Sequence, residues 1–398
     1  MSRQFIPEQV EELTPEWLTD ALRERGLLSG STVRKVRHEL LGVGDGFMGV
    51  LARLFLEFDG DGPDLPATLI AKLPTAVPEN RGMGELLGAY EREIYFYEEF
   101  ASRLPLRVPR VYYSALDRDP VSKHQEGIVG FVDRLPATLI RGSMAFARWV
   151  AARKQRRYLL LLEDLDGARP GDQVAAGNPE DCERVLKAIA RAHAAFWEHP
   201  SLVDPFWLFR PELQTRTRQL LYRDSLPPFE QRFGSLMREG LARVTGWLAE
   251  HGGALTRTLH SEAPHTLIHG DLRFDNLFFD DMRPDDPVIV IDWQLAGCGA
   301  GAYDVAYLIG GSLPSGASAE TEAGLLHAYH ESLVARGVKN YAYERFADDY
   351  SRGLLSVIQT IASVDLMEFG EERGVDLIDV WVERLLARTR NLDLDRLL

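Results

Sequence analysis

A short polar segment in the second half of the chain constrains its fold more than any other feature. Residues 269–276 have the sequence HGDLRFDN, which places Asp271 five positions before Asn276. The apolar run 288–291 predicts a buried strand, and Asp292 follows directly at its end. A carboxylate can accept a hydroxyl proton, and carboxylate and amide oxygens suit Mg²⁺. The spacing predicts a proton acceptor at Asp271 and a magnesium site at Asn276 and Asp292; the plainer alternative is three polar residues that cap loops.

A lysine and a glutamate occur where apolar side chains are expected. Lys72 lies near the end of an apolar strand predicted over 67–73, where an ammonium group usually reaches outward to solvent. Glu93 follows Tyr90 by three residues and precedes Tyr97 by four, so it shares the apolar stripe of a predicted helix. Because a carboxylate that faces a core requires a cation, we predict a buried ion pair between Lys72 and Glu93.

A glycine-rich segment precedes the strand predicted over 50–58. Gly44, Gly46 and Gly49 fit the pattern G-x-G-x-x-G, in which backbone N–H groups can approach phosphate oxygens because no side chain intervenes. A dinucleotide-binding loop of this kind is followed by a helix, whereas residues 50–58 alternate as a strand does. We interpret the glycines as a hairpin lid over phosphates, with a plain glycine-rich hairpin as the alternative.

These motifs together resemble the aminoglycoside phosphotransferase/choline kinase superfamily. The resemblance rests on HGDLRFDN, on VIDWQLAGCGAGAYDVAYL, and on the glycine, lysine and glutamate motifs that precede them in the same order. Trp293 and Gln294 after Asp292, and the segment 162–165, are similar to the ecdysteroid-kinase-like branch. The HGDxRxDN form also resembles the kinase-like domains found beside acyl-CoA dehydrogenases. The resemblance implies a protein-kinase-like fold and an enzyme that uses ATP and Mg²⁺.

The resemblance also implies roles for the polar residues of the second half. Asp271 would be the catalytic base, and Asn276 and Asp292 would bind Mg²⁺. His269 would orient the catalytic loop, and Asp304 would anchor the segment after Asp292. We expect His269 and Asp304 to be scaffold rather than chemical groups.

In the first half the resemblance implies a nucleotide site. Lys72 would contact the α- and β-phosphates and Glu93 would orient it. The backbone of Glu163, Asp164 and Leu165 would hold adenine. Whether the nucleotide is ATP or GTP does not follow from the sequence, although ATP is the expected cofactor.

The expected fold class is α+β with two lobes. Residues 1–163 would form an N-terminal lobe with an antiparallel sheet, an N-terminal helix and one key helix over 86–101, and residues 164–398 a larger helical lobe. An insert at about 118–157 interrupts the first lobe. Five further helices are predicted over 180–198, 229–251, 320–336, 341–369 and 376–390.

Charge and composition exclude several classes of partner. The chain has 45 basic and 60 acidic residues, a net charge of −15, and nucleic acids and anionic membranes attract basic surfaces instead. Neither a signal core nor a membrane-spanning apolar run occurs, and Cys182 and Cys298 fit no disulfide framework. We expect a soluble, cytoplasmic protein with a small-molecule partner. The sequence does not indicate an oligomeric state.

Three functional classes compete. A small-molecule kinase, which transfers phosphate to a hydroxyl group, explains every motif. A regulatory pseudokinase would lack one of Lys72, Asp271, Asn276 or Asp292, and all four are present. A nucleotide-dependent oxidoreductase lacks the helix after its glycine loop. A protein substrate is disfavoured because only eleven residues separate Asp292 from Asp304, too few for an activation segment.

The acceptor is the least determined part. We expect an apolar alcohol or a hydroxy-acyl compound, and the alternative is an aminoglycoside. Aromatic residues favour the former, acidic residues the latter, and both sets can equally be core and surface. The aromatic set, with one methionine, comprises Phe206, Trp207, Trp293, Met367 and Trp381. The acidic set comprises Asp365, Glu368, Glu371, Glu372 and Asp379.

A basic cluster lies in the expected insert. Arg148, Arg153, Lys154, Arg156 and Arg157 are predicted to share a helix. A solvated helix face is the plainer interpretation, and a lid that contacts an anionic acceptor such as a hydroxy acid is the sharper one.

Overall fold

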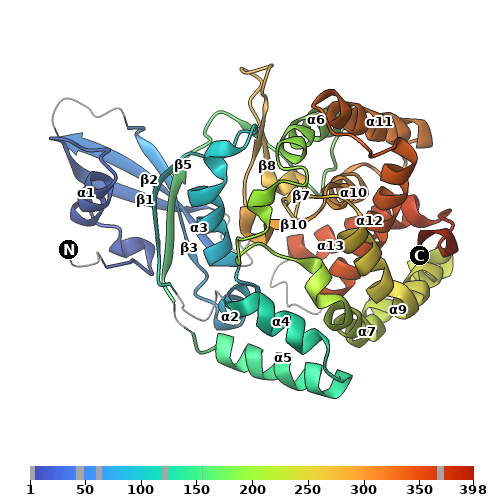
Figure 1. Ribbon diagram of the computed structural model, residues 1–398. Coiled ribbons are helices and arrows are strands. Elements are labelled where there is room, and N and C mark those ends of the chain that lie inside the picture. Colours follow the sequence, from blue (N-terminus) through green and yellow to red (C-terminus); the bar gives the residue numbers. More distant parts are fainter. Residues whose placement is uncertain (1–4, 42–48, 60–64, 119–123, 155, 365–371) are drawn as a thin grey trace. The chain divides into compact units, whose positions relative to one another are not determined.

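The structure, a computed structural model, describes residues 5–41, 49–59, 65–118, 124–154, 156–364 and 372–398. It divides into two compact units (Figure 1), which we call the N-terminal and the C-terminal unit. The N-terminal unit comprises Met1–Ser102, Val108–Pro120 and Met144–Gly167. The C-terminal unit comprises Arg103–Arg107, Val121–Ser143 and Ala168–Leu398. The segment expected as an insert therefore contributes to both units.

An antiparallel sheet of five strands forms the frame of the N-terminal unit, with the strand order β1-β2-β3-β5-β4. The strands are β1 (Thr32–Leu41), β2 (Gly49–Asp59), β3 (Thr68–Pro74), β4 (Val111–Leu116) and β5 (Tyr158–Glu163). The alternation predicted for β2 is confirmed, because Ala52, Leu54 and Leu56 are buried in one core. This pattern is typical of a strand with one face toward the core.

Helix α1 (Pro15–Glu24) closes this core. The Thr14 hydroxyl accepts a hydrogen bond from the Trp17 N–H at 3.2 Å, and Pro15 occupies the first helical position. Leu18 and Leu22 pack into the same cluster as the strand residues. The predicted N-terminal helix is confirmed, and threonine is a residue type that satisfies free N–H groups at a helix start.

The helix predicted over 86–101 is confirmed over residues 89–99, but its start is wrong. The chain forms α2 (Pro78–Leu87) and α3 (Ala89–Glu99), separated at Gly88, whose φ of 65° is left-handed. Glycine adopts this conformation without steric cost, so it ends one helix and starts the next. Helix α3 packs against β4 and β5 and is buried on nearly all sides.

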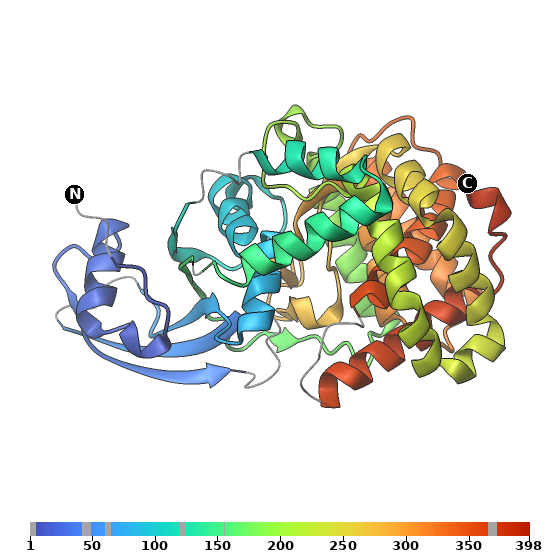
Figure 2. The same ribbon diagram turned by 90° about the horizontal axis from the view of Figure 1, so that it is seen from below.

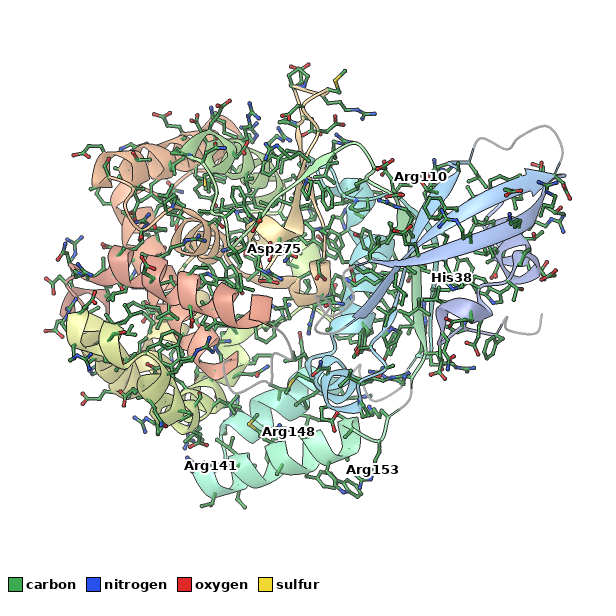
Figure 3. The ribbon with its side chains drawn as sticks, turned by 180° about the vertical axis from the view of Figure 1, so that it is seen from behind. His38, Arg110, Arg141, Arg148, Arg153 and Asp275 are labelled. Atoms are coloured by element: carbon green, nitrogen blue, oxygen red, sulfur yellow. The ribbon has the colours of Figure 1, made fainter. Side chains whose placement is uncertain are left out.

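Two helices occupy the expected insert, α4 (Gln125–Asp133) and α5 (Ala137–Ala151). The predicted basic helix is only partly correct. Helix α5 ends before Arg153, so of the five basic residues only Arg148 lies on it. Figure 3 shows Arg141 and Arg148 along α5 and Arg153 just after its end.

Helices dominate the C-terminal unit, as predicted. Figure 2 shows several of them side by side, and α12 packs against α7, α9, α10 and α13. The helices are α6 (Pro179–Ala195), α7 (Thr215–Arg232), α8 (Gly234–Leu236), α9 (Ala242–Arg257), α10 (Gly301–Ser312), α11 (Ala319–Ala335), α12 (Tyr343–Val364) and α13 (Glu372–Thr389). Two small sheets have the orders β6-β8-β9 and β10-β7. Their strands are β6 (Arg169–Pro170), β7 (His265–Ile268), β8 (Leu277–Phe279), β9 (Val288–Val290) and β10 (Gly297–Ala300).

The helix predicted over 229–251 is also wrong. Helix α7 ends at Arg232, and α9 begins at Ala242. Gly240 lies between them with φ of 122°, a conformation that interrupts a regular helix. The hydrophobic spacing continues across this break, so periodicity alone does not reveal it.

Candidate active site

The predicted ion pair in the N-terminal unit is confirmed. Lys72 of β3 lies 2.8 Å from one carboxylate oxygen of Glu93 on α3 and 2.9 Å from the other. The two side chains are 13% and 3% exposed. A pair this enclosed holds both side chains in one position, because either charge alone would be costly to bury.

The glycine segment joins two neighbouring strands. In the antiparallel pair β1–β2, Leu41 lies opposite Leu51. Gly44 and Gly46 lie outside the described residues. A Cβ atom at Gly49 would lie 3.2 Å from the Leu73 carbonyl oxygen and 3.8 Å from Cε of Lys72. Glycine at this position therefore lets β2 approach the strand that carries the lysine.

The expected adenine segment, residues 163–165, is anchored within the N-terminal unit. The Glu163 N–H already donates to the Arg110 carbonyl oxygen at 2.8 Å, so this amide is not available to a base. The buried Asp164 carboxylate lies 2.8 Å from Nε of Arg53 on β2, and this contact raises the pKa of the guanidinium. Leu165 is half-buried. Sequence reasoning missed Arg53, whose place in an alternating strand gave no distinguishing signal.

In the C-terminal unit Asp304 anchors the loop that contains Asp271. Its two carboxylate oxygens accept hydrogen bonds from the His269 and Gly270 N–H groups at 2.6 and 2.9 Å. Gly270 has φ of 84°, and a Cβ atom there would lie 2.4 Å from the Leu295 carbonyl oxygen. Asp304 thus holds the catalytic loop itself, and not the segment after Asp292 as we expected.

The His269 ring connects the two ends of the predicted site. Its Nδ1 accepts a hydrogen bond from the Asp271 N–H at 3.2 Å, and its Nε2 lies 2.9 Å from the Ile291 carbonyl oxygen. Ile291 immediately precedes Asp292. The structure therefore gives His269 the scaffold role that we expected for it.

The Asp271 carboxylate is held by residues of its own loop. Its Oδ2 accepts hydrogen bonds from Nδ2 of Asn276 at 3.0 Å and from Nε of Arg273 at 3.3 Å. The same guanidinium bonds Asp275, which Figure 3 labels, at 2.5 Å. Burial lowers the pKa of Arg273, but the charges of Asp271 and Asp275 outweigh it and raise the pKa overall. Arg273 was not singled out from the sequence, although it lies within the motif.

Tyr307 is a second neighbour of Asp271 that sequence reasoning missed. Burial raises its pKa far above the ordinary value, and the charge of Asp271 and a hydrogen bond with that carboxylate raise it further. The Tyr307 ring packs edge-on against Trp381 at 5.2 Å between ring centroids. A neutral phenol with this enclosure can donate its proton to Asp271 and fix the carboxylate orientation.

The two predicted metal ligands lie beside neighbouring strands, Asn276 directly before β8 and Asp292 shortly after β9. Leu277 of β8 is opposite Val290 of β9, and the Ile291 N–H donates to the Asn276 carbonyl oxygen at 3.0 Å. Asp292 has φ of 62°, an uncommon conformation for a residue other than glycine. Nδ2 of Asn276 donates hydrogen bonds to Asp271, so the side-chain oxygen of Asn276 is the atom that could bind a cation. An amide and a carboxylate oxygen fit Mg²⁺, and no cluster of three His, Cys, Asp or Glu competes among the described residues.

A network of buried hydrogen bonds also holds the loop that contains Asp271. The Gln173 N–H donates to Asp275 at 2.8 Å, and the Gln173 side chain accepts from the Phe274 N–H at 2.7 Å. Arg384 of α13 donates to the carbonyl oxygens of Gln173 and Gly311 at 2.6 and 2.8 Å. The loop position is therefore determined by segments about 100 residues away on either side, which no local pattern reveals.

Most aromatic candidates for an acceptor site belong to the core. Trp293 is 0% exposed and packs edge-on against His269 at 4.7 Å. Its N–H donates to the Val290 carbonyl oxygen, so it cannot form a pocket wall as we expected. Trp207 and Trp381 are buried, and Phe206 is half-buried.

Among the acidic candidates, Asp379 is exposed and lies 2.8 Å from Arg232. Met367, Asp365, Glu368 and Glu371 lie outside the described residues, as does the side chain of Glu372.

Two of the basic residues of the insert form ion pairs within the N-terminal unit. Arg156 lies 2.7 Å from Glu85 and 2.8 Å from Glu91 in the N-terminal unit, with a largely buried side chain. Arg157 pairs with Asp117 at 2.8 Å. Arg148 and Arg153 are exposed, as a solvated face requires.

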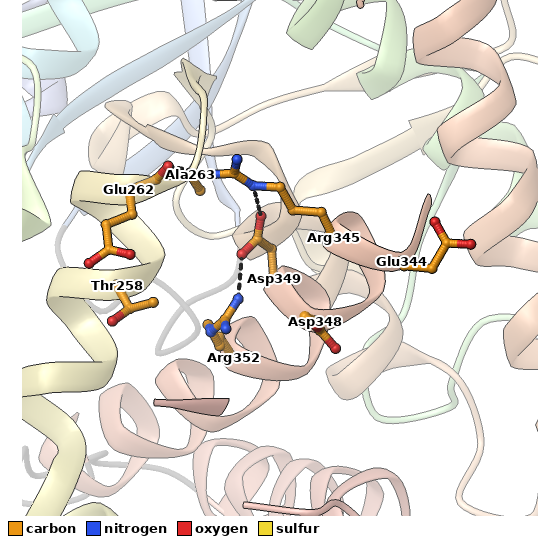
Figure 4. Close-up of a pocket in the computed structure, with 8 residues that line it drawn as sticks. All are labelled: Thr258, Glu262, Ala263, Glu344, Arg345, Asp348, Asp349 and Arg352. Carbon is orange, nitrogen blue, oxygen red and sulfur yellow. Dashed lines mark hydrogen bonds and ion pairs between the residues drawn. The ribbon is translucent and has the colours of Figure 1, made fainter. Parts of the chain in front are cut away.

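A separate polar pocket of about 440 Å³ lies in the C-terminal unit (Figure 4). The predicted site residues do not line it. Asp349 at its wall pairs with Arg352 at 2.8 Å, and Arg345 donates to the Glu262 carbonyl oxygen. Asp349, Arg352 and Arg345 are thus bonded to other groups of the pocket wall, and none of these three side chains indicates a ligand. The lining residues are Thr258, Glu262, Ala263, Glu344, Arg345, Asp348, Asp349 and Arg352.

Within the described ranges, no helix combines the length and the apolar character that a membrane crossing requires.

Comparisons with known proteins agree with the geometry. The model of the "Ecdysteroid kinase-like family" matches residues 43–340. The solved GDP and kanamycin complex of APH(2")-IIia is similar with a TM-score of 0.52 and 15% identity, over 95% of this chain and 99% of that chain. A microcompartment-associated aminopropanol kinase has a TM-score of 0.50 and 16% identity, over 93% and 96%. At such identities the likeness establishes the fold alone. No curated protein matches significantly.

The family match covers about three quarters of the chain, and the predicted α+β, protein-kinase-like fold class is confirmed. The chain belongs to the ecdysteroid kinase-like family.

Proposed function

We propose that this protein transfers the γ-phosphoryl group of ATP to a hydroxyl group of a small molecule. The observation that carries this proposal is the geometry of Asp271. Asn276 and Arg273 hold its carboxylate, and Asp304 holds the loop backbone beneath it. Positioning a general base in this way is the main contribution that a protein makes to phosphoryl transfer, together with charge stabilisation.

The transfer requires one proton acceptor. The acceptor hydroxyl gives its proton to Asp271, its oxygen forms a bond to the γ-phosphorus, and the bond from phosphorus to the bridging oxygen breaks, so that ADP leaves. Arg273 and Asn276 keep the carboxylate in one orientation during this exchange. General-base catalysis of this kind typically contributes about 10²- to 10⁴-fold.

The resemblance assigns nucleotide-binding roles to individual residues. Lys72, fixed by Glu93, would contact the α- and β-phosphates, the glycine segment would cover them, and the backbone of Asp164 and Leu165 would hold adenine. Asn276 and Asp292 would hold Mg²⁺. When bound, the ion neutralises developing charge on the phosphate oxygens.

For the acceptor, we favour an alcohol of the hydroxy-acyl class, and the alternative is an aminoglycoside. Relatives of similar fold are described with kanamycin and as an aminopropanol kinase, so amino alcohols belong in the comparison. A nucleotide-binding pseudokinase is the third possibility, and the presence of Lys72, Asp271, Asn276 and Asp292 argues against it.

An acceptor screen tests the proposal. The purified protein is incubated with ATP, Mg²⁺ and a panel of hydroxy acids, hydroxyacyl thioesters, sterols, aminopropanol and kanamycin, and ADP is measured together with the mass of the product. We expect turnover that depends on an alcohol, with the highest kcat/KM for a hydroxy-acyl compound. A higher kcat/KM for kanamycin would establish the alternative, and nucleotide binding without turnover of any acceptor would indicate a pseudokinase.

A further inference from the structure

The C-terminal unit contains a guanidinium group without a counter-charge. Arg218 lies on α7, and within the described part of the chain its one hydrogen bond runs from Nη2 to the Thr360 hydroxyl of α12 at 3.1 Å. Its Nε is buried and has no partner. Every other buried arginine discussed above contacts a carboxylate or several carbonyl oxygens, so Arg218 is the exception.

Burying such a group is expensive unless an anion accompanies it. Burial lowers the pKa of Arg218, and only the Tyr303 phenol opposes this shift. An arginine nevertheless remains charged in proteins, so the cost is not avoided by loss of a proton. A buried charge without a partner costs several kcal/mol, and a bound anion would offset that cost.

Further unsatisfied polar atoms lie beside Tyr303. The His260 ring packs edge-on against the Tyr303 ring at 5.6 Å between centroids, and neither of its ring nitrogens has a partner. Burial and the charge of Arg218 lower the pKa of His260 well below its usual range. The imidazole is therefore neutral and can donate one N–H without adding charge. Among the described residues, Nε of Arg218 and the protonated ring nitrogen of His260 are therefore donors without an acceptor.

This polar cluster is connected to Asp271 through two tyrosines of α10. The Tyr303 hydroxyl lies 3.4 Å from the Thr360 hydroxyl, which also accepts from Arg218. The Tyr303 and Tyr307 rings lie one helical turn apart, 5.7 Å between centroids. Burial, together with the charge of Asp271, raises the pKa of Tyr307. The charges of both Arg218 and Asp271 affect the pKa of Tyr303, so it lies within reach of both.

We propose that Arg218, with the Tyr303 hydroxyl, binds a carboxylate of the acceptor while the acceptor's hydroxyl group faces Asp271. This inference rests on the kinase function proposed above and specifies its substrate class, a hydroxy acid. A single guanidinium matches a single negative charge. A phosphate dianion would need a second cation, and Arg273, the other guanidinium of this region, is already bonded to Asp271 and Asp275. A polycationic aminoglycoside would be repelled.

Paired acceptors and matched variants test the carboxylate site. Hydroxy acids of four to eight carbons are compared with their methyl esters and with phosphate-bearing alcohols, in the wild type, Arg218→Met, Arg218→Lys and the control Arg223→Met. Arg223 lies on the same helix and is exposed. We expect the wild type to favour the acid over its ester, and Arg218→Met to lower kcat/KM for the acid by about 10- to 100-fold with little effect on the ester. Arg218→Lys should restore part of the preference, and the control should retain all of it.

Thermal unfolding with butanoate or hexanoate, which lack a hydroxyl, provides a readout that does not depend on turnover. These ions should raise the Tm of the wild type and of Arg223→Met, but not of Arg218→Met. If this shift occurs as expected and no compound is phosphorylated, the carboxylate site stands and the kinase function fails. If esters and acids are turned over equally, with no effect of Arg218→Met, the kinase function stands and the carboxylate site is overturned. A preference for phosphate-bearing alcohols would also overturn it.

Discussion

The two units bury charge in opposite ways. In the N-terminal unit, Lys72 pairs with Glu93 at 2.8 Å and Arg156 pairs with Glu85 and Glu91 at 2.7 and 2.8 Å. In the C-terminal unit, one guanidinium serves both Asp271 and Asp275. Another, that of Arg218, has no carboxylate at all among the described residues.

This difference separates charges that maintain the fold from charges that await a ligand. A buried ion pair is costly to break because the remaining partner stays uncompensated. A buried charge that is already uncompensated lowers stability, and selection retains it only where function gains from it. Removing the charge of Lys72 should therefore destabilise the N-terminal unit, whereas removing the charge of Arg218 should impair function and leave stability largely unchanged.

The largest effect is expected at Asp271. Asp271→Asn keeps the size of the side chain and its hydrogen-bonding capacity but removes the proton acceptor. Turnover of any accepted alcohol should fall by about 10²- to 10⁴-fold. Nucleotide affinity and Tm should be unchanged, in contrast with the variants of the N-terminal unit. Steady-state kinetics measure turnover, calorimetric titration measures nucleotide affinity, and thermal unfolding measures Tm. The variant Asp281→Asn, at an exposed position, serves as the control. Normal turnover in Asp271→Asn would refute the role of the base.

The next largest effect is expected at the N-terminal ion pair. Lys72→Met leaves the Glu93 carboxylate enclosed without a cation, so the free energy of unfolding should fall by about 3–5 kcal/mol. The double variant Lys72→Met/Glu93→Leu should recover much of this loss. Denaturant titration measures both.

Two further variants complete this comparison. Lys35→Met, which removes an exposed pair with Glu57, should change stability by less than about 1 kcal/mol. Arg218→Met should not lower it. If Arg218→Met destabilises the protein as much as Lys72→Met does, the contrast between the units is wrong.

A smaller effect is expected at the metal site. Asp292→Ala removes a carboxylate ligand from the ion that also contacts the phosphates. Affinity for an ATP analogue in the presence of Mg²⁺ should weaken by about 10-fold or more, with little change when EDTA is present. Isothermal titration under both conditions measures this. Equal weakening with and without Mg²⁺ would mean that Asp292 does not act through a metal ion.

The smallest effect concerns the two cysteines of the C-terminal unit, which are buried as neutral groups. Burial raises the pKa of Cys182 to about 12 and that of Cys298 to about 11. Both thiols should resist iodoacetamide at pH 8 in the native protein and react after denaturation, which mass spectrometry can quantify. Because the folded protein retains these protons to higher pH, stability should decline as pH rises above about 9. Rapid native alkylation at pH 8 would contradict this.

Much of the site could be predicted because its signals are local. Asp271, Arg273, Asp275 and Asn276 lie within one loop, and the hydrogen bonds that join them to one another span five residues or fewer. The Lys72–Glu93 pair was predictable because both side chains occupy buried positions of a regular strand and helix. Gly88 shows the limit of the same method, since its left-handed conformation divides a helix whose spacing continues.

The sequence by itself predicted most of the strands and helices and the candidate catalytic loop, because strand alternation, helical periodicity and the loop motif depend on neighbours along the chain. Only the tertiary structure decided which charges are paired. Arg156 looks like a solvated residue until Glu85 and Glu91 are found beside it, and Trp293 looks like a pocket wall until its burial is known. Arg218 donates its hydrogen bond to Thr360, which is 142 residues away in the sequence. The free energy of a buried charge depends on its distance to groups that folding brings near, and a local sequence pattern does not predict that distance.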